Sequence, residues 1–147
     1  MTPPNNLDIE RTLCLIKPDA VSSGKIGEIL TILEDDNFHI LKMRMMQMSP
    51  NIAQRFYYIH KNKHFYDGLI EFMTSSPIIA MVLEREDAIN RLRRLAGDTD
   101  SKTAAKGTIR NKYGTDIQRN AIHASDSIES AVYEIDVIFG HKKEGEV

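Results

Sequence analysis

Apolar and polar residues alternate along this chain in blocks that predict strands and helices. Nearly continuous apolar runs predict strands at residues 11–16, 38–48, 78–83 and 120–123. Apolar residues three or four positions apart predict helices at residues 26–37, 50–60, 65–72, 86–95 and from 126 onward. The resulting order, β-α-β-α-α-β-α-loop-β-α, is typical of an α+β fold. We therefore expect a ferredoxin-like split β-α-β sandwich, with a four-stranded antiparallel sheet and helices on one of its faces.

Residues with known capping preferences mark several of the expected helix ends. Ser49 followed by Pro50 is a preferred helix start, and Gly97 is a preferred end. Asp126, with Glu129 three residues later, resembles a capping box at the start of the last helix. This helix is strongly amphipathic, and we expect its inward face to consist of Ile128, Ala131, Val132, Ile135, Ile138 and Phe139.

One segment, at about residues 97–118, shows no convincing helical or strand period. It is rich in Thr, Lys, Ala and Gly. Loops of this length are uncommon in compact domains and are usually functional or disordered. We therefore expect a long loop at this position.

Length and composition predict a single cytoplasmic domain. The 147 residues suit one domain, which we place at residues 10–140, between a flexible arm at 1–9 and a polar tail at 141–147. The apolar runs are too short to span a bilayer, and the chain starts without the basic and apolar regions of a signal peptide. Cys14 is the single cysteine, which excludes an internal disulfide and suggests an inert core position.

Charge and motifs disfavour several classes of function. The net charge of −2 gives no sign of a surface for nucleic acid or an anionic membrane, so neither partner is expected. Ile26 follows Gly24-Lys25 where a Walker-type phosphate loop would have Ser or Thr, and no Gly-x-Gly-x-x-Gly occurs. His60 and His64 lie four residues apart, but no third metal ligand accompanies them. Bound phosphates would therefore be held by side chains.

His123 is the most informative residue of the chain. It ends a short apolar run and is followed at once by a helix start. A neutral imidazole is a competent nucleophile near neutral pH when a carboxylate fixes its tautomer, and Glu134 lies on the following helix. Lys17 is also unusual, because it stands at the end of an apolar strand. Phe65 and Leu69 suit either core packing or a platform for a nucleobase.

These residues stand in segments that resemble the nucleoside diphosphate kinase family over about residues 10–140. The matching segments, in chain order, are Arg11-Thr12-Leu13, Ile16-Lys17-Pro18-Asp19-Ala20-Val21, Phe56-Tyr57 with His60, Phe72-Met73-Thr74-Ser75, Gly97-x-Thr99, Gly107-Thr108-Ile109-Arg110, Asn120-x-x-His123-x-Ser125-Asp126-Ser127 and Glu134-Ile135. The histidine segment together with Lys-Pro-Asp is highly specific to that family.

The resemblance implies an enzyme with a phosphohistidine intermediate. It implies ping-pong transfer of the γ-phosphate from a nucleoside triphosphate, typically ATP, to a nucleoside diphosphate through His123, with Glu134 as the orienting carboxylate. This exchange maintains the pools of nucleoside and deoxynucleoside triphosphates. The residues implied to contact phosphate and ribose are Lys17, Tyr57, Arg93, Thr99, Arg110 and Asn120. Those implied to contact the base are Phe65, Leu69 and Ile117.

The resemblance also implies a cofactor and an assembly. Mg²⁺ would be held mainly by the nucleotide phosphates, so no strong protein metal site is expected. The chain would form a homo-oligomer, either a hexamer or a tetramer. Within the long loop, Asp100-Ser101 replaces the usual Asn-Pro and Lys106 replaces a frequent Pro, which predicts a less rigid loop and puts its subunit contacts in question.

Two alternatives of other classes remain open at this level. One is a catalytically silent, nucleotide-binding regulatory subunit derived from the same family, which is disfavoured because the nucleophile and the phosphate contacts are present. The other is an RNA-binding ferredoxin-like module, which is disfavoured by the net charge of −2 and by the lack of an aromatic strand motif.

Overall fold

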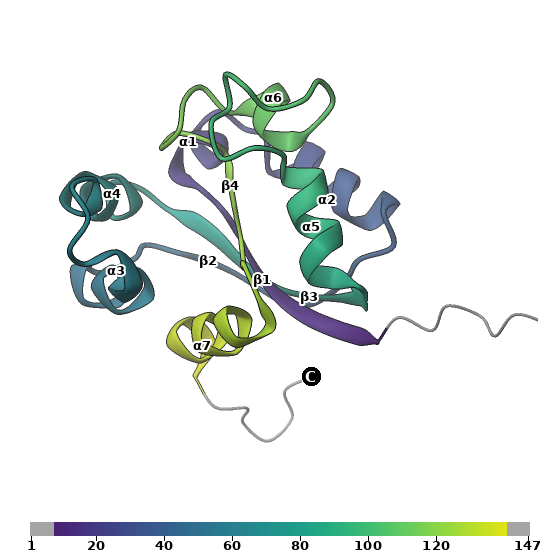
Figure 1. Ribbon diagram of the computed structural model, residues 1–147, viewed down its shortest axis with the longest axis horizontal. Helices are drawn as coiled ribbons and strands as arrows, with labels where there is room; N and C mark the ends of the chain where they lie inside the picture. Colours follow the sequence, from purple (N-terminus) through teal and green to yellow (C-terminus); the bar gives the residue numbers. More distant parts are fainter. Residues whose placement is uncertain (1–7, 141–147) are drawn as a thin grey trace, which may run out of the picture.

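A four-stranded antiparallel sheet forms the centre of the fold (Figure 1). The computed structural model describes residues 8–140, so the tail expected at 141–147 and residues 1–7 of the expected arm lie outside the described residues. The strands, in spatial order, are β2 (His39–Met46), β3 (Ile78–Glu86), β1 (Ile9–Ile16) and β4 (Ile122–Ala124). The predicted α+β architecture and antiparallel sheet are confirmed, although β1 begins two residues earlier than expected.

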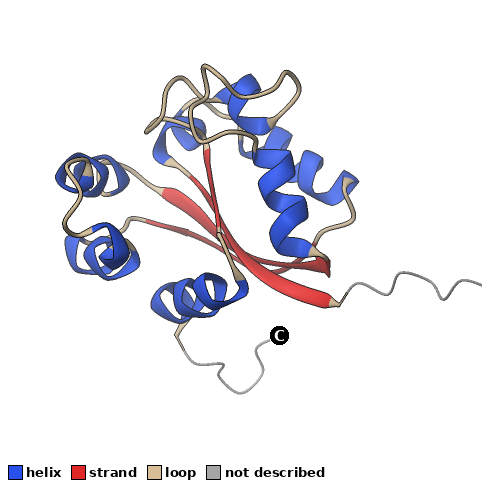
Figure 2. Ribbon diagram, viewed as in Figure 1, coloured by secondary structure: helices blue, strands red, loops and turns tan. Residues whose placement is uncertain are grey.

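Helices cover both faces of this sheet, so the expectation of helices on one face was wrong (Figure 2). The helices that contribute to the cluster on one face are α1 (Pro18–Ser22), α2 (Ile26–Asp35), α5 (Ala88–Ala96) and α6 (Ile109–Tyr113). Those on the other face are α3 (Pro50–Phe56), α4 (Tyr66–Met73) and α7 (Ile128–Phe139), with a 3-10 turn at Tyr58–His60 after α3. Among residues 8–140, no helix is long and apolar enough to cross a membrane.

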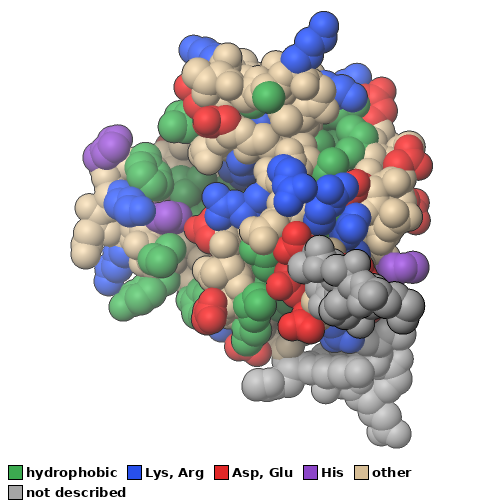
Figure 3. Space-filling view, turned by 45° about the vertical axis from the view of Figure 1, so that its right-hand side comes forward, with side chains coloured by type: hydrophobic (Ala, Val, Ile, Leu, Met, Phe, Trp, Pro, Cys, Tyr) green, Lys and Arg blue, Asp and Glu red, His purple; other side chains and the backbone are tan. Residues whose placement is uncertain are grey.

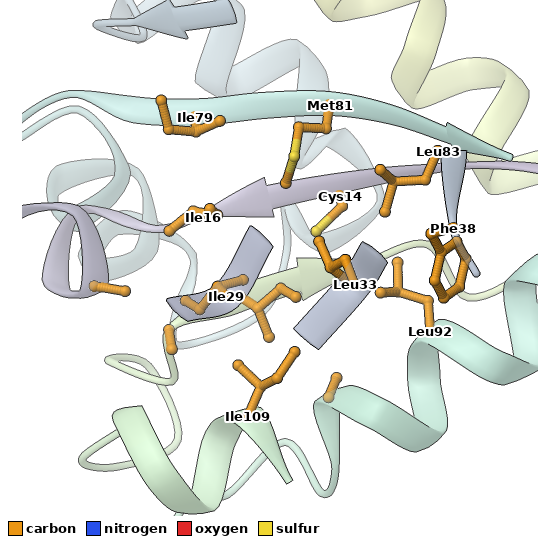
Figure 4. Close-up of a cluster of buried hydrophobic side chains, with 14 of the residues drawn as sticks. Cys14, Ile16, Ile29, Leu33, Phe38, Ile79, Met81, Leu83, Leu92 and Ile109 are labelled. Carbon is orange, nitrogen blue, oxygen red and sulfur yellow. The ribbon is translucent and has the colours of Figure 1, made fainter. Parts of the chain in front are cut away.

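The sequence of β1 explains the two-sided burial. Cys14 and Ile16 point into the cluster shown in Figure 4, whereas Leu13 and Leu15 belong to the cluster on the opposite face. All four side chains are fully buried. Because successive side chains of a strand point to opposite faces, a continuous apolar run requires cover on both sides of the sheet.

The segment expected to be a long loop contains a short helix, α6, which the sequence pattern did not reveal. Thr108 starts this helix, because its hydroxyl accepts a hydrogen bond from the N–H of Asn111 at 3.3 Å. Ile109 is fully buried and anchors the helix to the core. Five residues are too few to display a 3.6-residue period, which explains why this element escaped the pattern.

The predicted start of α3 and the predicted end of α5 are confirmed, whereas α3 ends at Phe56, earlier than expected, and α5 begins at Ala88 rather than at residue 86. The Ser49 hydroxyl accepts a hydrogen bond from the N–H of Ile52 at 3.1 Å. Gly97 ends α5 with a φ of 86°, in the region that favours glycine. A Cβ at this position would lie 2.5 Å from the hydroxyl of Thr108, so the turn after α5 has room for glycine alone.

The start of α7 differs from the expectation. Ser127, rather than Asp126, caps the helix, because its hydroxyl accepts a hydrogen bond from the N–H of Ser130 at 3.1 Å. Asp126 instead pairs with Arg93, with 3.1 Å between the carboxylate and the guanidinium. The expected capping box of Asp126 and Glu129 was therefore wrong.

The expected inward face of α7 was also partly wrong. Ile128 and Val132 are 52% and 65% exposed. The inward stripe runs instead through Ala131, Glu134 and Ile138, which are spaced three and four residues apart. The apolar pattern gave the wrong face because a carboxylate, that of Glu134, lies in the middle of the buried stripe. It faces the sheet there because it pairs with His123.

Replacing Ser127 with Ala should lower the free energy of unfolding by about 1 kcal/mol, because the N–H of Ser130 loses its acceptor. Urea unfolding followed by circular dichroism measures this change. Asp126→Ala is the matched control and should leave the free energy nearly unchanged, because its ion pair is exposed. A larger decrease in the free energy of unfolding for Asp126→Ala than for Ser127→Ala would show that Asp126 caps the helix.

Candidate active site

His123 lies on the edge strand β4, opposite Leu15 of β1. Its Nε2 lies 2.7 Å from Oε1 of Glu134, and the two side chains are only 18% and 12% exposed. The rings of Phe56 and Tyr57 pack edge-on against the imidazole, with centroids 5.0 and 6.4 Å away. With Nε2 engaged by a carboxylate, the other ring nitrogen, Nδ1, retains the lone pair needed for nucleophilic attack.

Ser125 completes the support of Glu134 and was missed as a site residue in the sequence. Its hydroxyl donates a hydrogen bond to Oε1 of Glu134 at 2.8 Å and accepts one from the N–H of Leu13 at 3.2 Å. Ser125 is fully buried, so this carboxylate oxygen is held by both the histidine and the serine. The available signal was its place in the matched segment, two residues after His123.

The chain enters β4 through a strained turn. Ala121 has a φ of 72°, and the N–H of Ile122 donates to the carbonyl of Asn120 at 2.8 Å, as in a γ-turn. Both backbone groups of Ala121 are hydrogen-bonded. Its N–H donates to the Asp19 carboxylate at 3.0 Å, and its carbonyl accepts from the N–H of Lys17 at 2.8 Å. Such strain persists where surrounding bonds over-determine it, often at functional sites.

A cavity of about 250 Å³ opens beside β4 and gathers three of the predicted phosphate-binding residues. Its lining residues are Arg93, Gly97, Asp98, Thr99, Arg110, Ala124 and Asp126. Figure 3 shows Lys and Arg side chains gathered across the middle of one face of the molecule, bordered by Asp and Glu side chains. The net charge of −2 therefore conceals a local basic region.

Two guanidinium groups define the charge of this cavity. Arg110 is held rigidly, because it donates to the carbonyls of Gly97 and Ile122 at 2.9 and 3.0 Å. Burial lowers its pKa, and the nearby charge of Arg93 acts in the same direction. Arg93 is more exposed and pairs with Asp126 at the rim. Two cations that repel each other in a partly buried cavity favour binding of an anion between them.

Lys17 is a buried cation next to the same region. Its side chain is 6% exposed, and Nζ lies 3.4 Å from the carbonyl of Gln118. Burial lowers its pKa to about 8, Arg110 acts in the same direction, and Asp19 and Asp116 oppose the shift. Lys17 therefore remains mostly charged at neutral pH, at the cost of desolvating an ammonium group.

Three predicted site residues present buried polar atoms without a hydrogen-bond partner among residues 8–140. These atoms are the Tyr57 hydroxyl, Nε of Arg110 and Oδ1 of Asn120. The amide nitrogen of Asn120 is anchored, because it donates to the carbonyls of Thr99 and Ile117 at 2.9 and 3.1 Å. Since buried polar atoms are normally satisfied, this arrangement suits a polar ligand that supplies the missing partners.

The predicted base-contacting residues differ in exposure. Phe65 and Ile117 are 39% and 64% exposed, whereas Leu69 is buried in the core at 8%. A Cβ at Gly68 would lie 3.5 Å from the side chain of Gln118, so α4 runs alongside the segment that carries Ile117. The exposed Phe65 and Ile117 are thus available to a planar ligand, whereas Leu69 anchors α4 to the core.

No group of three His, Cys, Asp or Glu side chains within residues 8–140 lies close enough together to hold a metal ion. Asp98 and Asp126 are the carboxylates that line the cavity. His60 lies within 3.0 Å of the Lys63 ammonium through its Nδ1.

Comparisons with known proteins point to one family. The family model described as nucleoside diphosphate kinase matches residues 10–144. The nucleoside diphosphate kinase of Aquifex aeolicus is 48% identical over 134 residues, which cover 89% of this chain and 94% of that protein. The corresponding protein of Staphylothermus marinus is 49% identical over 133 residues, which cover 90% of this chain and 94% of the relative.

Solved structures give the same result. The orthorhombic crystal form of the Aquifex aeolicus nucleoside diphosphate kinase matches with a TM-score of 0.88 and 47% identity, covering 90% of this chain and 96% of that one. A halophilic nucleoside diphosphate kinase from Halobacterium salinarum in complex with CDP matches with a TM-score of 0.88 and 40% identity, covering 91% and 90%. Sequence and fold agree over nearly the whole chain, which therefore belongs to the nucleoside diphosphate kinase family.

Proposed function

We propose that this chain exchanges the γ-phosphate between nucleoside triphosphates and diphosphates through a phosphohistidine at His123. The hydrogen bond between Nε2 of His123 and Glu134 carries the proposal, because it leaves Nδ1 as the free nucleophile. We assign the activity to residues 10–140, and we place it in the cytoplasm, where nucleoside triphosphates are made and used.

The chemistry proceeds in two mirrored halves. Nδ1 of His123 attacks the γ-phosphorus, the N–P bond forms, and the bond from phosphorus to the β-phosphate oxygen breaks, so that a nucleoside diphosphate leaves. The ring gains positive charge, which the Glu134 carboxylate stabilises at Nε2–H. A second nucleoside diphosphate then attacks the phosphohistidine through its terminal phosphate oxygen and regenerates the free imidazole.

The remaining residues position the phosphates and neutralise their charge. Arg93 and Arg110 lie in the cavity beside β4, and Lys17 supplies a further cation from the end of β1. The unpartnered hydroxyl of Tyr57 and the free oxygen of Asn120 suit hydrogen bonds to phosphate or ribose. Alignment of this kind contributes roughly 7–11 kcal/mol to catalysis when the reacting atoms are well placed.

The nucleotide would bring Mg²⁺ with it as its phosphate complex. The metal supplies neutralisation of the phosphate oxygens during transfer. Asp98 and Asp126 line the cavity and carry the carboxylates suited to hydrogen bonds with water molecules around such an ion.

Base recognition would depend on stacking. Phe65 and Ile117 are exposed apolar side chains, and stacking on an aromatic ring tolerates every base. The related Halobacterium salinarum enzyme was crystallised in complex with CDP, which supports a nucleotide site in this fold. We therefore propose that purine and pyrimidine nucleoside diphosphates all serve as acceptors, which turnover with each diphosphate would test.

We further propose that the chain assembles into a homo-oligomer through the open edge of its sheet. β2 is an edge strand, and its Met43 and Met45 are 54% and 58% exposed. An open edge with apolar side chains is a preferred surface for pairing with a second copy. Light scattering of the purified chain should give the mass of a tetramer or hexamer, and a monomer mass would contradict the proposal.

Incubation with ATP and Mg²⁺ without an acceptor should add one phosphoryl group to the chain, and the adduct should be labile in acid and stable in base. His123→Ala should abolish both the adduct and the exchange reaction, because the attacking nitrogen is gone. Intact-mass measurement detects the adduct. An unmodified wild-type chain would favour a silent regulatory subunit. An adduct that persists in His123→Ala would show that another residue is the nucleophile.

Glu134→Gln should fold normally and lower turnover by about 10- to 1000-fold, because the charge that orients and stabilises the imidazole is lost. Steady-state exchange kinetics measure this effect. Glu129→Gln is the matched control on the same helix and should retain full activity, since Glu129 is exposed. Equal behaviour of the two variants would reduce Glu134 to a structural residue.

The affinity for nucleoside diphosphate should fall as pH rises through about 8, because Lys17 loses its charge there in the free enzyme. A nucleotide phosphate stabilises the charged form, so binding above this pH must first return a proton to Lys17. The KM for ADP as a function of pH measures the effect. Lys17→Arg keeps its charge across this range, and its KM should lack the rise; identical profiles would assign the pH dependence to another group.

A further inference from the structure

A compact loop at residues 115–119 is built around the side chain of Asp116. Oδ1 of Asp116 accepts hydrogen bonds from the N–H of Gln118 at 2.9 Å and the N–H of Arg119 at 2.7 Å. The N–H of Thr115 donates to the carbonyl of Arg119 at 2.6 Å and closes the loop. The carboxylate thus accepts the hydrogen bonds that backbone carbonyls would accept from these two N–H groups in a helix or sheet.

This loop supplies backbone contacts to two residues of the proposed nucleotide site. The carbonyl of Gln118 accepts from the ammonium of Lys17 at 3.4 Å, and the carbonyl of Ile117 accepts from the amide of Asn120 at 3.1 Å. Ile117 itself is 64% exposed on the loop. The positions of an ammonium, an amide and an apolar side chain therefore all depend on the shape of one short turn.

The loop is also tied to neighbouring elements. The carbonyl of Asp116 accepts from the N–H of Ser101 at 3.4 Å, which joins it to the segment after α5. Arg119 lies 3.8 Å from the Asp116 carboxylate and 5.9 Å from the ring centroid of Phe72 on α4. The loop thus connects the segment after α5, through Asp116, with α4, through Arg119.

We propose that Asp116 is a positioning residue for nucleotide binding: its carboxylate fixes the carbonyls of Ile117 and Gln118, and through them the amide of Asn120 and the ammonium of Lys17. This inference rests on the function proposed above, because Lys17 and Asn120 are the groups assigned there to the nucleotide. Asp116 would act on the site through the shape of the loop and through its charge near Lys17.

The charge of Asp116 has a second effect on the same lysine. The charged groups that act on Lys17 are Arg110, which lowers its pKa, and Asp19 and Asp116, which raise it. Hydrogen bonds from the backbone of Arg119 lower the pKa of Asp116 itself, so the carboxylate is charged at neutral pH. Asp116 therefore helps to keep the buried ammonium protonated.

Two substitutions separate the roles of shape and charge. Asp116→Ala removes both, and it should weaken ADP binding about 3- to 10-fold at every pH, as expected for the loss of two turn hydrogen bonds. Asp116→Asn keeps an acceptor oxygen and should restore affinity near neutral pH. Its affinity should then decline at a lower pH than that of wild type, because Lys17 loses its proton more readily. Calorimetric titration with ADP measures both effects.

A control variant and a spectroscopic readout make the test specific. Asp100 accepts the N–H of Lys102 at 3.0 Å in a similar turn, so Asp100→Ala should leave ADP affinity and the Lys17 titration unchanged. NMR titration of side-chain-labelled lysine should show a lower pKa for Lys17 in both Asp116 variants. In exchange kinetics the KM for ADP should change more than kcat, since the loop does not contact the pair of His123 and Glu134.

The outcomes are decisive in either direction. Weak binding by Asp116→Ala, recovery in Asp116→Asn and a lowered Lys17 pKa would support the proposal. Wild-type affinity in Asp116→Ala, or equal weakening in Asp100→Ala, would overturn it. A wild-type chain that forms no phosphohistidine would contradict the proposed function instead, while ADP titration and the Lys17 pKa would still judge the role of Asp116.

Discussion

The hydrogen bond between His123 and Glu134 is the interaction on which the rest of the site depends. It joins the edge strand β4 to helix α7, and Ser125 extends it to the backbone of β1 at Leu13. A carboxylate buried to this extent is costly unless hydrogen-bond donors reach it, and here Oε1 of Glu134 is shared by an imidazole and a hydroxyl. The imidazole of His123, the proposed nucleophile, is therefore oriented by the same contacts that attach α7 to the sheet.

The cations around the histidine place a second constraint on the fold. Lys17 is buried, Arg110 is partly buried beside Arg93, and several polar atoms of this region lack partners among residues 8–140. Each feature lowers the free energy of unfolding of the free protein. Each also favours binding of a polyanion, whose oxygens can pair with these cations and polar atoms. The strained turn at Ala121 belongs to the same pattern, because the backbone bonds of Asp19 and Lys17 hold it against its local preference.

Much of the fold could be predicted because the apolar runs of β1 and β3 are long and clear, and the matched segments named most residues that the structure brings together in the candidate site. The features that the sequence failed to predict have physical reasons. Helix α6 is too short for its helical period to be visible in the sequence. Helix α7 is capped by Ser127, one residue after Asp126, and the sequence offers both as preferred capping residues. The contacts of Ser125 and Asp19 could not be predicted, because they join positions about a hundred residues apart and depend on strand pairing that no local pattern encodes.

The pairing of β1 with β4 also determines when the enzyme can become active during its synthesis. Leu15 and His123 are neighbours in the sheet, although they lie far apart in the sequence. A ribosome would release β1 long before β4, and α7, which carries Glu134, would emerge after both. Non-local pairing of this kind slows folding and leaves the sheet edge temporarily uncovered. His123, the proposed nucleophile, would therefore acquire its partners only after β4 and α7 have both emerged, and a chain interrupted before α7 would carry the core strands without Glu134.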